Sequence, residues 1–61
     1  MTLEQVKELE GQIITVEQSE VLEESDHVES WENCGMSGVY PSCLWYVYKL
    51  TDGEELNVYI K

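Results

Sequence analysis

Positive charge is the scarcest property of this chain. Its 61 residues include three lysines and no arginine against 13 aspartates and glutamates, a formal net charge of −10. Proteins that bind nucleic acid neutralise its phosphates with lysine and arginine, and an acidic surface is repelled by an anionic membrane leaflet. The composition therefore predicts neither direct nucleic-acid binding nor membrane binding.

Long apolar runs are also missing. No stretch approaches the roughly 18–20 apolar residues of a membrane-spanning helix, and the segment after Met1 has neither the basic nor the apolar region of a secretory signal. We therefore expect a cytoplasmic protein. In a reducing cytoplasm Cys34 and Cys43 are expected to be free thiols, although the stretch between them contains glycine and proline and is flexible enough to close a disulfide loop.

Residues with catalytic or metal-binding chemistry are few. His27 is the only histidine, and its spacing from Cys34 and Cys43 matches no recognised zinc motif. A nucleophilic cysteine needs a nearby cation or helix N-terminus to form its thiolate, and cations are scarce here. Acids are plentiful, but no apolar pocket is indicated that would bring one into the range of a general acid. We expect no metal, no cofactor and no enzymatic activity.

Enough apolar surface remains for the chain to fold. Apolar residues make up 43% of it, including two tryptophans and four tyrosines, whereas disordered acidic segments are poor in aromatics. A chain of this length has room for one small core, and such domains bury only about 60% of the surface that the unfolded chain exposes. We expect a single small acidic domain over residues 1–61.

Two local patterns stand near the N-terminus. Thr2 and Gln5 have the spacing of a capping box, which predicts a helix over residues 3–10 that ends at Gly11. From Gln12 the apolar residues alternate with a period of two, which predicts a strand over residues 12–18.

The C-terminal third has the pattern of a β-hairpin. Two β-rich runs, residues 43–50 and 54–61, flank a turn of three residues that ends in Gly53. This turn places Lys49 opposite Glu55 and Trp45 opposite Tyr59. It puts on one face Leu44, Tyr46, Tyr48, Leu50, Leu56, Val58 and Ile60.

The acidic middle of the chain, Ser19 to Glu32, fits either a helix or strands. Like charges three or four residues apart destabilise a helix, which favours an edge-like strand around 20–24 and another near 27–32, followed by a loop over 33–42. The fold class is then α+β, with one short N-terminal helix packed on a three- or four-stranded antiparallel sheet that ends in a C-terminal β-hairpin.

The acids of this middle segment are the candidate site. A small domain normally carries a net charge of magnitude about 2–8, and a larger one destabilises the compact state by self-repulsion. The excess suggests that the negative field serves to occupy a surface built for another polyanion. The candidate partner-binding carboxylates are Glu17, Glu20, Glu23, Glu24, Asp26, Glu29 and Glu32, most of them three residues apart.

Other interpretations of this segment stay open. Trp31 is a candidate anchor in the partner, or it anchors the segment to the protein's own core. The acids alternatively form a solubilising surface, or bind cations or basic proteins of other kinds.

In size, charge and helix-plus-sheet pattern the chain resembles the small acidic DNA-mimic inhibitors encoded by phages. It is most similar to the type I anti-CRISPR proteins and less so to the uracil-DNA glycosylase inhibitors. These families share no residue motif, so no site is transferred by position. The resemblance implies a non-enzymatic inhibitor, a monomer or weak dimer in the cytoplasm of an infected host cell, that blocks the basic DNA-binding surface of a surveillance complex. Two alternatives from other classes remain: a structural or regulatory interaction module, which would expose an apolar face on the hairpin and form obligate oligomers, and a small redox or metal protein, which would bind zinc or form a reversible Cys34–Cys43 bridge.

Overall fold

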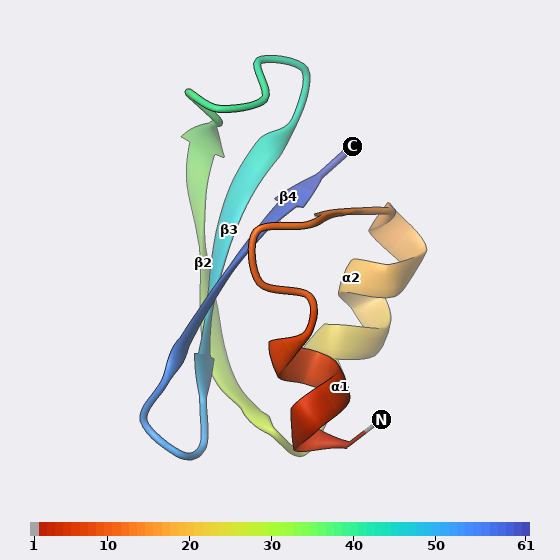
Figure 1. Cartoon of the computed structure of the whole chain (residues 1–61), viewed down its shortest axis with the longest axis vertical. Coiled ribbons are helices and arrows are strands. Elements are labelled where there is room, and N and C mark those ends of the chain that lie inside the picture. Colours follow the sequence, from red (N-terminus) through yellow and green to blue (C-terminus); the bar gives the residue numbers. More distant parts are fainter. Residues whose placement is uncertain (1) are drawn as a thin grey trace.

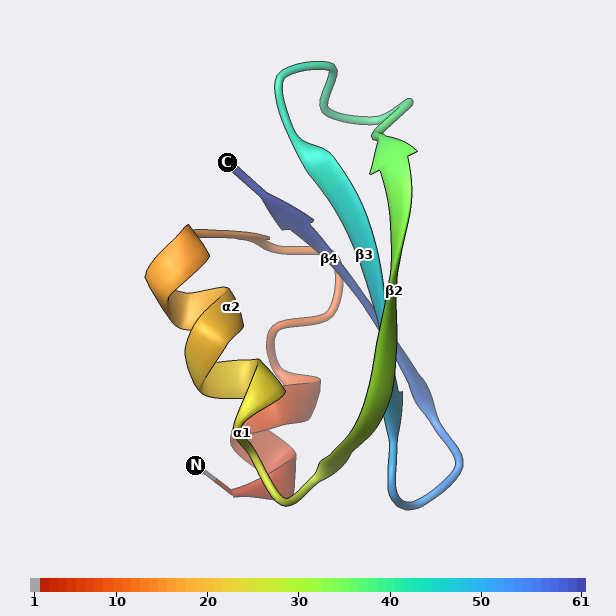
Figure 2. The same ribbon diagram turned by 180° about the vertical axis from the view of Figure 1, so that it is seen from behind.

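The computed structural model describes residues 2–61 as two helices packed on one face of a sheet (Figures 1 and 2). The strand order is β1-β4-β3-β2, which confirms the predicted α+β class. The elements are α1 (Leu3–Lys7), β1 (Ile13–Ile14), α2 (Val16–Glu23), β2 (Val28–Met36), β3 (Leu44–Leu50) and β4 (Glu55–Ile60).

The C-terminal hairpin has the predicted register. Lys49 lies opposite Glu55 and Trp45 opposite Tyr59. The Leu50 amide donates to the Glu54 carbonyl at 2.8 Å and so closes the turn of three residues. Gly53 has a φ of 92°, a conformation that glycine adopts at no steric cost.

The sheet is mixed, which corrects the prediction of a purely antiparallel one. β1 runs parallel to β4, with Ile13 opposite Tyr59 and Ile14 opposite Ile60. The Tyr59 amide donates to the Gln12 carbonyl at 3.0 Å. Alternation of side chains is the same in both directions of pairing, so the sequence pattern does not reveal strand direction. The strand predicted over 12–18 is only two residues long.

The largest correction is α2, a second helix where strands were favoured. Thr15 and Gln18 form a second capping box: the Gln18 amide donates to Thr15 Oγ1 at 3.1 Å, and the Thr15 amide to Gln18 Oε1 at 2.9 Å. Leu22 is fully buried, which stabilises the fold by about 1.5–3 kcal/mol, whereas each like-charge pair on a helix costs about 0.2–0.5 kcal/mol. The capping box and the buried leucine therefore outweigh the charge repulsion.

Two further boundaries differ from the predictions. α1 keeps its capping box at Thr2 but is shorter than predicted, because its last residues form a turn before Gly11. β2 continues to Met36, so the loop predicted over 33–42 begins later. An irregularity between Asn33 and Met36 permits this extension; it contains Gly35, which has a φ of 88°.

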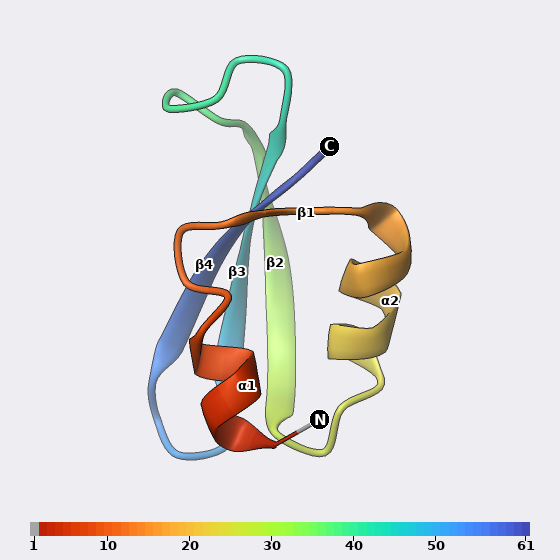
Figure 3. The same ribbon diagram turned by 45° about the vertical axis from the view of Figure 1, so that its right-hand side comes forward.

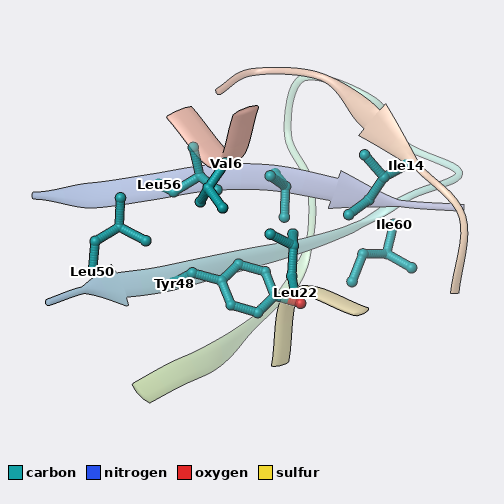
Figure 4. Packing of buried hydrophobic residues seen from close by; sticks show 8 residues of the cluster. Val6, Ile14, Leu22, Tyr48, Leu50, Leu56 and Ile60 are labelled. Carbon is teal, nitrogen blue, oxygen red and sulfur yellow. The ribbon is translucent and has the colours of Figure 1, made fainter. Parts of the chain in front are cut away.

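The core lies between the sheet and the two helices. Figure 3 shows α1 in front of the β4 side of the sheet and α2 beside β2. Val6 of α1 and Leu22 of α2 point into the apolar side chains of the sheet (Figure 4). The remaining buried members of this cluster are Ile14, Tyr48, Leu50, Leu56, Val58 and Ile60.

The acidic surface of α2 and β2

The eight candidate residues lie on two neighbouring elements. α2 contacts β2, and a short turn that contains Asp26 joins them. We call the carboxylates of this region the acidic surface. Its members are Glu17, Glu20, Glu23 and Glu24 at α2, Asp26 in the turn, and Glu29 and Glu32 on β2.

Three of these acids form a ridge along α2. Glu17, Glu20 and Glu24 are all exposed, and their spacing of three and four residues keeps them on one side of the helix. The ridge spans about 10 Å of helix axis at 1.5 Å per residue. Its neighbouring acids are about 4.5 and 6 Å apart along the helix axis, whereas a DNA strand carries one phosphate per about 3.4 Å, so the ridge is a row of negative charge about two-thirds as dense as one strand.

Glu23 has a different environment from the ridge. It is half-buried and accepts a hydrogen bond of 3.2 Å from the hydroxyl of Tyr48. Burial raises the pKa of Tyr48, and the negative charge of Glu23 and the hydrogen bond to it raise this pKa further. Glu23 therefore joins α2 to the sheet, and only part of it is free to meet a partner.

The acids of β2 extend this surface around an edge of the sheet. β2 is the last strand in the order, and Glu29 lies at an irregularity between Val28 and Ser30. Glu32 pairs with Val47, which belongs to the face away from the helices. Glu29 is thus exposed at the β2 edge, whereas Glu32 faces the side of the sheet away from the helices.

Trp31 packs against the core and is also partly exposed. It pairs with Tyr48 on the helix side, and the two ring centroids lie 6.3 Å apart with planes tilted by 37°. The side of the residue away from Tyr48 remains accessible, with 47% of its surface exposed. Trp31 is thus fixed to the core and also offers apolar area beside the acids.

No lysine forms an ion pair with the acidic surface within residues 2–61. The one ion pair in this part of the chain joins Lys7 of α1 to Asp52 of the hairpin turn, with Nζ and Oδ2 2.6 Å apart. Their hydrogen bond raises the pKa of Lys7 and lowers that of Asp52. α2 has no basic residue in its last turn, where a cation would complement the helix dipole.

The two thiols and the histidine lie on three different segments. Cys34 is exposed on β2 and Cys43 is buried before β3, and both are free, which confirms the free-thiol prediction. His27 lies in the turn between α2 and β2, where its carbonyl accepts from the Thr51 amide at 3.0 Å. Within the described chain, no three His, Cys, Asp or Glu side chains gather as a metal site.

Aromatic residues on the face of the sheet away from the helices were left out of the predicted site. Trp45 and Tyr59 form a cross-strand pair there, beside Val47. The predicted register already placed this pair on the face opposite to the core. What the sequence pattern did not reveal is that both helices pack on the core face and leave the other uncovered.

Comparison of the chain with protein-family models, with curated proteins and with solved structures finds no match. Over residues 2–61, none of the helices has the length and apolar character needed to cross a membrane. Any functional conclusion therefore depends on the chemistry of the surfaces described above.

Proposed function

We propose that this protein is a non-enzymatic inhibitor that imitates DNA through its acidic surface and blocks the basic DNA-binding surface of a host defence complex. The observation that carries this proposal is the run of carboxylates over α2 and β2, none of which forms an ion pair within the described residues. Glu24 stands at the C-terminal cap of α2, where the helix dipole disfavours an anion. A carboxylate at a position where it destabilises the helix is evidence for a role other than folding stability.

Electrostatics favours this partner over others. A DNA-binding groove concentrates lysine and arginine and focuses a positive field, which accelerates the association of an acidic ligand. The α2 ridge offers three carboxylates in a row on one side of the helix, with an axial spacing somewhat wider than that of phosphates along a strand. A type I CRISPR surveillance complex, which must hold duplex DNA to read it, is the proposed target, and uracil-DNA glycosylase is the alternative.

The test compares two triple variants that remove the same charge. Glu20→Gln, Glu24→Gln and Asp26→Asn remove three charges from the acidic surface and spare Glu23, because its carboxylate accepts the hydrogen bond from Tyr48. Glu4→Gln, Glu8→Gln and Glu54→Gln form the control, since these acids are exposed on α1 and the hairpin turn.

Inhibition is measured with a purified type I surveillance complex binding duplex DNA, and with uracil-DNA glycosylase acting on a uracil-containing duplex. We expect the first variant to lose roughly 100-fold in potency, at about 1 kcal/mol for each lost contact, and the control to lose much less. Inhibition should weaken with added salt, as for a ligand of a phosphate-binding groove.

If the two triple variants inhibited equally well, inhibition would depend on net charge and not on the position of the carboxylates. That result would contradict DNA mimicry by the acidic surface. If the wild-type protein inhibited neither the surveillance complex nor uracil-DNA glycosylase, both proposed targets would be wrong. Folding of each variant is checked by thermal melting, so that lost potency is separated from lost structure.

A further inference from the structure

One face of the sheet is uncovered. Both helices pack on the other face (Figures 1 and 2), and the uncovered side carries large apolar residues from three strands and a loop. Ile13 is 46% exposed, Trp45 37% and Tyr40 36%. We call this surface the open sheet face; its members are Ile13, Tyr40, Trp45, Val47 and Tyr59.

The aromatic side chains of the open sheet face are held in place. The indole N–H of Trp45 donates to Asn57 Oδ1 at 3.1 Å. Asn57 in turn donates from Nδ2 to Glu10 Oε1 at 3.2 Å, and its backbone amide donates to the other oxygen of that carboxylate. Large aromatic side chains that are already ordered lose little entropy on binding, as in the energetic centres of protein interfaces.

The second aromatic pair is ordered in the same way. Tyr40, in the loop before β3, packs edge-on against Tyr59 with the ring centroids 4.9 Å apart and the planes at 71°, a favoured aromatic geometry. The loop itself is tied by Ser37, whose Oγ accepts from the Val39 and Tyr40 amides at 3.0 Å each.

The charges around the open sheet face determine which kind of molecule can bind there. Glu32 and Glu55 line a hollow beside Val47, with Lys49 as its one cation, and Glu10 lies at the other margin through Asn57. A second copy of the chain would bring another net charge of −10, and DNA would bring phosphates, so both are repelled. A cationic segment complements the rim.

We propose that the open sheet face is a second docking surface, which binds a partner protein segment that carries arginine beside apolar side chains. A guanidinium plane stacks on Trp45 and pairs with Glu32 or Glu55, while the apolar neighbour covers Val47 and Tyr59. This surface is separate from the α2 ridge, so it does not depend on DNA mimicry.

The probe is a capped eight-residue peptide of alternating arginine and leucine, compared with one of alternating arginine and serine that has the same charge. Binding to the ¹⁵N-labelled full chain is followed by NMR. The two indole N–H signals report two places, Trp45 on the open sheet face and Trp31 beside the acidic surface. We expect the leucine peptide to bind at least 10-fold more tightly and to shift the Trp45 signal.

Substitutions on the open sheet face test whether the preference for the leucine peptide arises there. Trp45→Thr and Val47→Lys should each remove the preference for the leucine peptide, and thermal melting checks that each variant folds. Val21→Thr is the control, because it removes an exposed apolar side chain from α2. The Glu20→Gln, Glu24→Gln, Asp26→Asn variant should keep the preference, which separates this proposal from the proposed function.

Equal affinity for the two peptides would overturn the proposal, as would a preference that survives in folded Trp45→Thr or Val47→Lys protein. Light scattering tests the competing occupant. A wild-type dimer that Trp45→Thr abolishes would show that a second copy covers the face and that the charge argument is wrong.

Discussion

Glu24→Gln should stabilise the protein. Glu24 is exposed at the C-terminal cap of α2, where a negative charge opposes the helix dipole at a cost of about 0.3–1 kcal/mol. It also stands four residues after Glu20, a like-charge pair that costs about 0.2–0.5 kcal/mol. Glutamine has almost the same helix propensity as glutamate. Removing the charge should therefore raise the free energy of unfolding by about 0.5–1.5 kcal/mol.

Glu17→Gln is the matched control at the other end of the same helix. Glu17 lies in the first turn, where its charge interacts favourably with the dipole and offsets its repulsion from Glu20. Thermal melting followed by circular dichroism measures both variants. In a domain this small 1 kcal/mol shifts the melting temperature by about 4–8 °C, and the gain in Glu24→Gln should shrink in about 0.5 M salt. Equal stabilisation by both substitutions would refute the dipole argument.

Three further predictions concern the core and its edges. Val58→Ala should lower the free energy of unfolding by about 2 kcal/mol in urea titration, because Val58 is fully buried in β4; a loss under 0.5 kcal/mol would contradict its place in the core. Cys34→Ser should leave the melting temperature unchanged, whereas Cys43→Ser should lower it by burying a hydroxyl; similar melting of the two would be evidence against their different burial. Tyr48→Phe should cost about 1 kcal/mol by removing the hydrogen bond to Glu23. The folded-state pKa of Tyr48 is raised above its ordinary value of 10.0, so its contribution to stability is complete below that pH and is lost as the pH rises further. Alkaline unfolding should therefore be less steep in Tyr48→Phe, and an unchanged pH profile would contradict this assignment.

The sequence predicts the hairpin well because its determinants are local. Gly53 sets the length of the turn, and turn length sets the register that pairs Lys49 with Glu55. Both capping boxes are equally local, but only the one at Thr2 was read as a helix start. The second capping box, Thr15 and Gln18, starts α2 within the segment that the alternation of apolar residues predicts as a strand.

What the sequence did not predict depends on tertiary packing. α2 is stable because Leu22 reaches the core beside Tyr48, a contact between residues far apart in the chain. The parallel direction of β1 follows from the path of the chain from α1 across the edge of β4. Side chains alternate in the same way in parallel and antiparallel strands, so the sequence pattern does not predict this direction. The seven acids and Trp31 were named from composition and spacing, but their division between the two faces of the sheet required the pairing of β2 with β3.

That division bears on the shape of a partner. The α2 ridge lies on the helix layer, Glu29 at the β2 edge, and Glu32 on the opposite face beside the open sheet face. A flat surface would meet only one of these groups at a time, whereas a concave groove that receives the β2 edge would meet all three. Such a groove is also the shape that a double helix requires, and it concentrates positive potential at its walls. For the proposed basic partner, the wrapped arrangement of the acids therefore predicts a cleft rather than a flat patch, and we expect one wall of that cleft to lie next to Trp45 and Val47.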